Sequence, residues 1–261
     1  MPDLYTVSAR YYDEAYASAD DLQDVQFYVE VARRFGGPVL ELACGTGRVL
    51  LPFAQNGISI DGVDSSPAML EQLNKKLAQQ EASVRQRVSV FSGDLRSFRG
   101  ERRYGAVIIP FRPLQHMYTL DDQIAALKTA AFHLTDDGVL AFDVFYPRPE
   151  SMLAGIGEEK LELEWNTKDD PPKTIRRSVR KDSVDKIAQH FSATYLYRTY
   201  RDGKLIREET APLKMSWYTY PHLQALFLLA GLEPVEEYGD FDRTPMNNDS
   251  RQMIFVMRRS R

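Results

Sequence analysis

The sequence predicts an α/β fold in which helices cover both faces of a mostly parallel sheet, giving a three-layer sandwich. From Pro38 to about residue 145, short apolar runs alternate with segments of helical period, the pattern of strands joined by crossover helices. Between about residues 146 and 215, polar and apolar residues alternate, which indicates half-buried antiparallel strands. We therefore expect a core at residues 1–145 and 216–261 that includes an N-terminal helical lid, and an antiparallel β cap inserted at residues 146–215.

Five apolar runs predict the parallel strands, and the last of them is almost continuously apolar, which suits burial on both faces. The predicted strands are residues 38–43, 58–63, 87–91, 104–109 and 139–145. Helices are predicted at residues 48–55, at residues 67–77 and at residues 121–134, the last ending at Asp136-Asp137-Gly138. Ser66 is expected to cap the second helix, with Pro67 at its first position.

Turn signals set the limits of the later elements. Asp202-Gly203 predicts a two-residue hairpin turn, because both positions need positive φ. Asp-Asp-Pro-Pro at residues 169–172 predicts a second turn, and Gly231 is expected to end a helix over residues 221–230 in the left-handed conformation. The last strands are predicted at residues 232–238 and 252–257. A basic cluster is interpreted as a solvated strand face; it comprises Arg176, Arg177, Arg180 and Lys181.

The composition is that of an ordinary globular protein. Of 261 residues, 43% are hydrophobic and 27% charged, and 33 Lys plus Arg against 37 Asp plus Glu give a net charge of −4. Disordered, collagen-like and disulfide-dense classes are therefore excluded. The acidic balance argues against nucleic acid as a partner, because binding phosphates needs clustered basic residues.

Cysteine content and hydropathy predict a cytoplasmic protein with no membrane partner. The single cysteine, Cys44, cannot form an internal disulfide or a cysteine-based zinc site, and no metal site is predicted. The N-terminus lacks a basic region followed by an apolar stretch, so it does not have the pattern of a secretory signal. The apolar stretch at residues 223–232 is about half as long as a membrane helix must be.

The segment VLELACGTGR at residues 39–48 is the most informative part of the sequence. It reads as a strand that ends in a turn of small residues and opens a helix. Gly45 and Gly47 allow a ligand to approach the backbone closely, and the first turn of the following helix presents free N–H groups. A tight strand-to-helix connection without a ligand would have the same pattern, so this segment alone does not decide the function.

Two carboxylates sharpen the interpretation. Asp64 lies at the end of the second predicted strand, and Asp94 lies in a turn after the third. Ligands of open α/β sheets bind at the carboxyl ends of the strands, where Asp64 can accept both ribose hydroxyls and Asp94 the amino group of adenine. Each carboxylate alone could be a helix cap. Together they predict a nucleoside pocket.

Two residues argue against a nicotinamide dinucleotide. The dinucleotide fingerprint needs a small residue three places after its second glycine, and this chain has Leu50 there. Glu41, inside the first strand, would repel a pyrophosphate but would attract an ammonium or a sulfonium. The predicted ligand is therefore a nucleoside that carries a positive charge.

Five segments follow one another along the chain: ELACGTGR at 41–48, GVDSSPAML at 62–70, GDL at 93–95, HLTDDGVLAFDV at 133–144 and AGL at 230–232. In this order they resemble the class I S-adenosylmethionine-dependent methyltransferases. The resemblance spans residues 20–145 and 216–258, and it implies a Rossmann-like seven-stranded sheet that ends in a reversed hairpin. Ala43 departs from the family, which usually has glycine at that position, and we expect the small side chain to be tolerated.

The resemblance implies S-adenosylmethionine as the cofactor, S-adenosylhomocysteine as its product, and a set of residues that hold it. The turn from Glu41 to Gly47 would hold the methionine end, Asp64 the ribose, and Asp94 with Leu95 the adenine edge, while Met69 would pack on the ring. The full set of implied cofactor residues is Tyr16, Glu41, Ala43, Cys44, Gly45, Gly47, Asp64, Ser65, Met69, Asp94, Leu95, Pro110 and Phe111.

The acceptor side is predicted from the loop after the fourth strand and from the N-terminal tyrosines. His116 is placed for proton transfer, because imidazole titrates near neutral pH; the alternative is a histidine that only binds loop backbone. Residues 11–16, YYDEAY, and this loop resemble the sugar-amine N,N-dimethyltransferases, which implies that Tyr12 and His116 border the acceptor and Tyr16 the cofactor. The alternative for the tyrosines is an amphipathic helix packed on the sheet.

Further residues are expected at the acceptor or in structural roles. Arg112 stands where that subgroup usually has a small residue and could bind an acidic acceptor. His133 is interpreted as a favourable contact at a helix end. Aromatic side chains of the insertion and its exit could also bind the acceptor, although strand aromatics more often form core; they are Tyr195, Tyr197, Trp217 and Tyr218.

The predicted reaction is an in-line methyl transfer to a nitrogen or oxygen of a small-molecule acceptor, aligned by the protein. Two alternatives stay open, a non-catalytic protein that binds S-adenosylmethionine and, with less support, an RNA methyltransferase, because no basic face with interleaved aromatics is evident. The sequence does not identify the acceptor, the acceptor atom or the oligomeric state.

Overall fold

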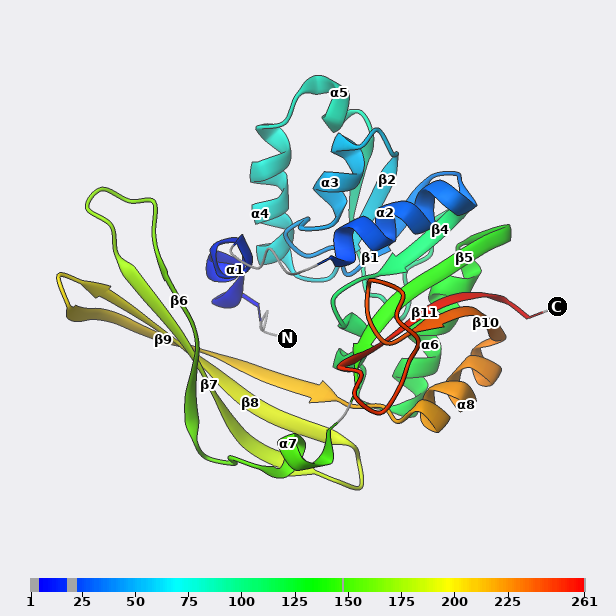
Figure 1. The fold of residues 1–261 in the computed structure, drawn as a ribbon. Helices are drawn as coiled ribbons and strands as arrows, with labels where there is room; N and C mark the ends of the chain where they lie inside the picture. The colour runs from blue at the N-terminus through cyan, green and yellow to red at the C-terminus, as the bar shows by residue number, and fades with distance from the viewer. Residues whose placement is uncertain (1–4, 18–22, 147, 261) are drawn as a thin grey trace. The chain divides into compact units, whose positions relative to one another are not determined.

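The computed structural model describes residues 5–17, 23–146 and 148–260, which cluster into two compact units (Figure 1). The larger unit comprises the described parts of residues 22–147 and 217–261, and the smaller unit those of residues 1–21 and 148–216. Within the described residues, no helix combines the length and the apolar character needed to cross a membrane.

A seven-stranded sheet forms the centre of the larger unit, in the order β10-β11-β5-β4-β1-β2-β3. Only β11 runs against its neighbours, pairing antiparallel with both β5 and β10, while the remaining pairs are parallel. This arrangement confirms the predicted mostly parallel sheet with a reversed hairpin at its end. The strands are β1 (Val39–Leu42), β2 (Ile60–Asp64), β3 (Val88–Ser92), β4 (Tyr104–Ile109), β5 (Leu134–Phe145), β10 (Leu232–Tyr238) and β11 (Gln252–Arg259).

Helices cover both faces of this sheet because successive side chains of a strand point to opposite faces. In β1, Val39 packs in one core cluster with residues of α2, α3 and α4, whereas Leu40 and Leu42 pack in the other with residues of α6 and α8. The helices are α2 (Asp24–Phe35), α3 (Leu50–Gln55), α4 (Pro67–Ala78), α5 (Ala82–Arg85), α6 (Leu120–Phe132) and α8 (Tyr220–Ala230), with a 3-10 helix η1 (Pro113–His116).

The predicted caps are present at α4 and α8. The Ser66 hydroxyl accepts a hydrogen bond from the Met69 N–H, and Pro67 occupies the first turn of α4. Gly231 ends α8 in the left-handed conformation, with φ 68° and ψ 40°.

The predicted turn between α6 and β5 was wrong. Strand β5 begins at Leu134 and runs through Asp136, Asp137 and Gly138. Its register against β4 shifts there, from Tyr104 opposite Leu134 to Ala106 opposite Val139, so the extra residues are accommodated as an irregularity of the ladder. Gly138 is required at this shift because a Cβ there would lie 2.8 Å from the carbonyl oxygen of Tyr104.

The smaller unit is built on a four-stranded antiparallel sheet in the order β6-β7-β8-β9. Asp202 and Gly203 form the predicted hairpin turn between β8 and β9, both with positive φ, of 49° and 73°. Residues 169–172 lie between β6 and β7, as predicted. The elements of this unit are α1 (Ser8–Ala17), α7 (Pro149–Leu153), β6 (Glu159–Asn166), β7 (Thr174–Asp185), β8 (His190–Arg201) and β9 (Lys204–Ser216).

Helix α1 packs on this antiparallel sheet, whereas the sequence analysis had grouped the N-terminal segment with the core. The ring of Tyr11 stacks on that of Tyr197 with centroids 4.5 Å apart, and its hydroxyl donates to Glu209 at 2.6 Å. The Trp165 indole N–H donates to Glu14 at 2.9 Å. These contacts are local to one unit, and sequence periodicity carries no signal for them.

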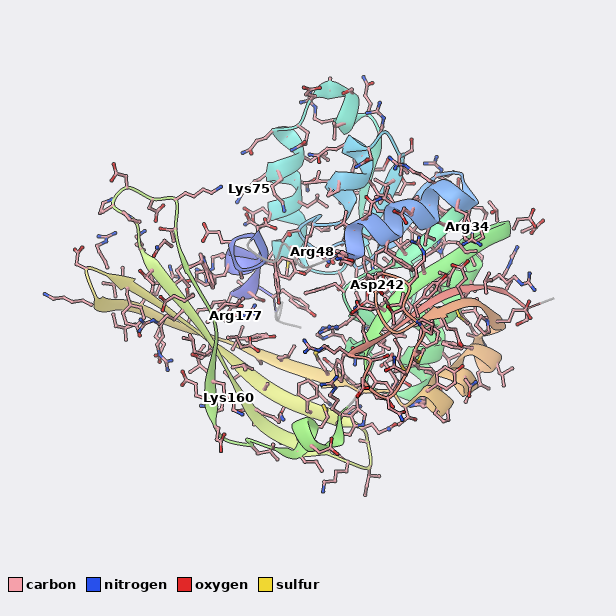
Figure 2. All side chains as sticks on the ribbon, in the orientation of Figure 1. Arg34, Arg48, Lys75, Lys160, Arg177 and Asp242 are labelled. Carbon is pink, nitrogen blue, oxygen red and sulfur yellow. The ribbon has the colours of Figure 1, made fainter. Side chains whose placement is uncertain are left out.

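The interpretation of Arg177 as part of a solvated strand face was wrong. Its side chain is only 7% exposed and lies against α1, where it donates to the Tyr16 hydroxyl at 3.2 Å and pairs with Glu162 at 3.2 Å (Figure 2). The guanidinium also lies 4.8 Å from the centroid of the Tyr195 ring. Tyr197 is buried and Tyr195 partly buried within this cluster, and burial raises the pKa of both phenols.

Candidate functional site

The carboxyl ends of β1, β2 and β3 bring the predicted glycine turn and both predicted carboxylates together. These strands are neighbours in the sheet. The Gly45 N–H donates to Oδ2 of Asp64 at 2.8 Å, and the Gly93 N–H donates to the backbone carbonyl of Asp64 at 3.0 Å. Asp64 therefore connects the turn after β1 to the turn after β3, in which Asp94 lies.

The glycine turn adopts a conformation that disfavours side chains. Ala43, Gly45 and Gly47 all have positive φ, of 62°, 54° and 81°. At Gly47 a Cβ would also lie 2.4 Å from Cδ1 of Leu73, so glycine is required there for packing as well as for φ. Ala43 adopts this conformation although an L-residue in this region carries a strain of about 1 kcal/mol.

Glu41 is a buried carboxylate on β1, only 2% exposed. Its Oε2 atom has no hydrogen-bond partner among the described residues. Burial raises the pKa of Glu41 well above its ordinary value, opposed in part by the charge of Arg48. Since a buried polar atom is normally paired, this oxygen is suited to a cationic ligand.

Arg48 lies beside Glu41 and is held by Asp24 of α2. The guanidinium donates to Oδ1 of Asp24 at 3.0 Å and to Oδ2 at 2.5 Å, with Asp24 almost completely buried. Its cation also lies 4.7 Å from the centroid of the Phe111 ring. Figure 2 shows Arg48 near the end of α2 in the larger unit.

Asp64 is partly exposed, and the start of α4 lies beside it. Its Oδ1 accepts from the Ser66 N–H at 2.8 Å, so the carboxylate is oriented by backbone donors on both sides. Met69, in the first turn of α4, is buried, while Ser65 is exposed. Cys44 is buried too, and burial raises the pKa of its thiol well above the ordinary value.

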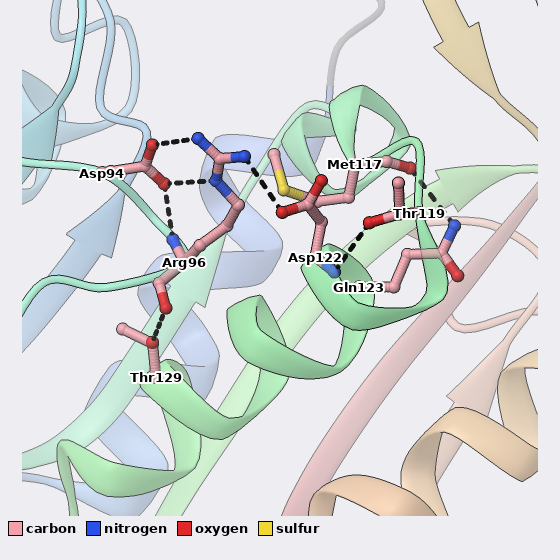
Figure 3. Close-up of polar contacts among 7 residues, drawn as sticks. All are labelled: Asp94, Arg96, Met117, Thr119, Asp122, Gln123 and Thr129. Carbon is pink, nitrogen blue, oxygen red and sulfur yellow. Dashed lines mark hydrogen bonds and ion pairs between the residues drawn. The ribbon is translucent and has the colours of Figure 1, made fainter.

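Asp94 follows β3 and is held by its neighbour Arg96 (Figure 3). Oδ1 of Asp94 accepts from the backbone N–H of Arg96 at 2.8 Å and from its Nε at 2.9 Å, while Oδ2 accepts from its Nη2 at 2.5 Å. The hydrogen bonds to Arg96 lower the pKa of Asp94. The next residue, Leu95, is buried.

The loop after β4 is anchored to β5. Phe111 and Arg112 both have positive φ, of 67° and 72°, and the Phe111 N–H donates to Oδ1 of Asp143 at 2.7 Å. The Tyr28 hydroxyl donates to the same oxygen at 2.7 Å. Nε of Arg112 lies 4.0 Å from Oδ2 of Asp143, so this arginine already faces a buried carboxylate. Pro110 is buried before the turn.

His116 ends the 3-10 helix of this loop and is partly exposed. Tyr218 holds this loop in place, because its hydroxyl donates to the Leu114 carbonyl at 2.6 Å. Tyr218 has no exposed surface, so its expected contact with an acceptor was wrong: the phenol serves the core. Trp217 beside it is partly exposed.

His133 lies at the C-terminal end of α6 and contacts a carbonyl of that helix, as its sequence position indicates, but as a neutral ring. The ring is fully buried and stacks on Phe98 at 5.2 Å. Its Nδ1 lies 2.8 Å from the Thr129 carbonyl and its Nε2 accepts from the Gly100 N–H at 3.0 Å, which is the pattern of a neutral imidazole protonated at Nδ1. Burial lowers the pKa of His133, in keeping with a neutral ring.

The structure places most of the predicted cofactor residues in the larger unit, but the residues that orient them were not predicted. Tyr12 and Tyr16 belong to the smaller unit, where their rings lie 4.8 Å apart. Asp143 has a signal in retrospect, as a carboxylate inside the apolar run VLAFDVF. Asp24 and Arg96 have none, because ordinary charged residues at helix and turn positions are expected to be solvated.

Comparison with known proteins identifies the family to which the chain belongs. The family described as "Methyltransferase domain" matches residues 39–138. The dTDP-3-amino-3,6-dideoxy-alpha-D-glucopyranose N,N-dimethyltransferase of Streptomyces fradiae is 30% identical over 198 residues, 74% of this chain and 69% of that protein. YqeM of Bacillus subtilis is 32% identical over 142 residues, so the chain spans about half the length of that relative, 55%.

Among solved structures, the CcbJ methyltransferase from Streptomyces caelestis is 26% identical, with a TM-score of 0.77 over 91% of this chain and 90% of that one. The chain therefore belongs to the class I S-adenosylmethionine-dependent methyltransferases, and S-adenosylmethionine is the cofactor of that family. The resemblance drawn from the motifs is thus confirmed, as is the Rossmann-like fold.

Proposed function

We propose that this protein transfers a methyl group from S-adenosylmethionine to the amino nitrogen of an amino sugar or a similar small molecule. The observation that carries the proposal is the buried Glu41 carboxylate, whose Oε2 lacks a partner among the described residues, beside the glycine turn and Asp64. S-adenosylmethionine combines a cation with a ribose, and the site offers a carboxyl group suited to each, Glu41 for the cation and Asp64 for the ribose. The amino-sugar acceptor is suggested by the name of the Streptomyces fradiae relative.

The residues present fit the cofactor. Glu41 would accept a hydrogen bond from the ammonium of its methionine part, and Asp64 would accept from the ribose hydroxyls. Asp94 and the Leu95 N–H would bind the adenine edge, with Met69 against the ring. The bound cofactor supplies a methyl group on a positively charged sulfur, which is already activated for displacement. The chain therefore has mainly to bind, align and exclude water.

His116 is the proposed proton acceptor for the attacking amine. An amine that attacks as a nucleophile must lose a proton, and imidazole is suited to take it near neutral pH. Tyr12 is proposed to orient the acceptor and Tyr16 to border the cofactor, both by likeness to the sugar-amine methyltransferases. Arg112 and Trp217 stay as proposed acceptor contacts, with Arg112 suited to an acidic group.

Methyl transfer from radiolabelled S-adenosylmethionine to a dTDP-linked 3-amino sugar tests the proposal. We expect labelled product in single turnover, and a rate about a hundredfold lower for His116→Gln, the range expected for losing a general base. His190→Gln, which removes a histidine of β8, is the matched control and should keep the rate. Tight cofactor binding without transfer to any amine would instead support a non-catalytic binding protein.

A further inference from the structure

Asp94 has almost no hydrogen-bonding capacity left over after Arg96 is satisfied. An ionised carboxylate offers about four lone-pair sites. Arg96 occupies three of them, two on Oδ1 through its backbone N–H and Nε, and one on Oδ2 through Nη2. The Asp94 side chain is nevertheless 34% exposed, so the remaining site on Oδ2 can be reached by a ligand.

Arg96 is in turn fixed to helix α6 at two points (Figure 3). Its Nη1 donates to Oδ1 of Asp122 at 3.0 Å, and its backbone carbonyl accepts from the Thr129 hydroxyl at 2.8 Å. Thr119 caps the helix by accepting from the Asp122 N–H at 3.1 Å, which holds the first turn in place. The carboxylate of Asp94 is therefore oriented by a rigid element rather than by its own loop alone.

We propose that Arg96 is a positioning residue for purine selection: it holds Asp94 so that a single acceptor site faces the base, which favours adenine over a 6-oxopurine. The inference rests on the proposed cofactor site. An adenine presents an N–H donor at C6, which the available lone pair of Oδ2 can accept. A hypoxanthine presents an oxygen there, which meets a fixed negative charge and cannot be accommodated by rotation of the carboxylate.

Calorimetric titration with S-adenosylhomocysteine and S-inosylhomocysteine tests this inference without turnover. For the unaltered protein we expect a preference for the adenine compound of about a hundredfold, and for Arg96→Leu a preference reduced about tenfold. Arg103→Leu is the matched control, because Arg103 of the same loop donates to the backbone carbonyls of Glu101 and Arg102, at 3.4 Å and 3.5 Å, rather than to Asp94 or Thr129. It should keep the preference.

The pH dependence separates positioning from a merely structural role. Arg96 lowers the pKa of Asp94, so its removal should make binding of S-adenosylhomocysteine weaken at a higher pH on acidification than in the unaltered protein. Unchanged selectivity and an unchanged pH profile in a folded Arg96→Leu protein would overturn the inference. Failure of the unaltered protein to bind S-adenosylhomocysteine would instead refute the proposed function.

Two further variants test the positioning role of Arg96 if Arg96→Leu does not fold. Arg96→Lys keeps the charge but cannot bind both oxygens of Asp94, so it should lose part of the preference. Asp122→Asn weakens the hold on the guanidinium from α6 and leaves Asp94 untouched, so we expect a smaller loss in the same direction. Full preference for adenine in both variants would contradict the inference.

Discussion

Burial of Glu41 makes the stability of the fold depend on pH, because a charge on a buried carboxyl is costly. Burial raises its folded-state pKa well above the ordinary value of 4.5. Below pH 4.5 the carboxyl is protonated in both states and carries no penalty. Above it the unfolded chain loses the proton that the folded protein keeps, so this residue makes folding less favourable as pH rises through the interval up to the folded pKa.

Glu41→Gln should therefore gain in relative stability as pH rises. The unfolding free energy of the variant minus that of the unaltered protein is expected to increase with pH, by at most about 1.4 kcal/mol per pH unit, the limit for one proton. Denaturant unfolding at pH 5 and pH 8 measures it, with Glu71→Gln on the exposed face of α4 as the control. A pH-independent difference would contradict the assigned protonation.

Ala43 gives a second prediction for a single residue. With φ at 62°, its backbone lies in the region that glycine enters without strain. Ala43→Gly should stabilise the protein by up to about 1 kcal/mol in chemical denaturation, because the strain relieved outweighs the added freedom of the unfolded chain. Ala125→Gly, in the interior of α6, should instead destabilise by about 1 kcal/mol. Equal destabilisation at both sites would argue against strain at Ala43.

The position of the loop after β4 depends on one carboxylate of β5, that of Asp143. Asp143 is buried and accepts from both Tyr28 of α2 and the backbone of Phe111, so helix, strand and loop are joined at one side chain. Burial raises the pKa of Asp143, and these hydrogen bonds and the charge of Arg112 oppose the shift. Loss of one donor leaves a buried charge poorly satisfied.

Tyr28→Phe should accordingly cost about 1.5–3 kcal/mol of unfolding free energy, the range for a hydrogen bond to a charged group. Tyr220→Phe is the control, because the Tyr220 hydroxyl donates to Glu237, which is more exposed than Asp143. We expect this substitution to cost less than about 1 kcal/mol of unfolding free energy. Thermal or denaturant unfolding measures both. A Tyr28→Phe variant as stable as the unaltered protein would show that Asp143 is satisfied without it.

The elements that sequence periodicity predicted well are those whose signal is local. Strands β1 to β4, the cap at Ser66 and the turn at Gly231 follow from apolar runs and from residues with special φ or capping chemistry. The features that periodicity did not predict depend on contacts between residues far apart in the chain. The start of β5 is set by its pairing with β4, and the burial of Arg177 is set by Tyr16, far away in the chain.

In the molecule as a whole, the same distinction between local signals and distant contacts holds for the candidate site. Glu41, Asp64 and Asp94 were predictable because they follow or lie in strands that are consecutive in sequence and adjacent in the sheet. Asp24 and Arg96 orient site residues through side-chain contacts for which the sequence carries no signal, whereas Asp143 is marked only as a carboxylate inside an apolar run. Motifs therefore predict the candidate site, and the structure is needed to find what holds its residues in position.

The central claim is that Asp64, with Glu41 and the glycine turn, binds the cofactor. Calorimetric titration of S-adenosylmethionine into the unaltered protein, Asp64→Ala and Asp242→Ala is its most direct test. We predict that binding becomes undetectable in Asp64→Ala and is unchanged in Asp242→Ala, whose carboxylate accepts from Thr244 within its own turn. Binding of unaltered affinity in a folded Asp64→Ala protein would contradict the account.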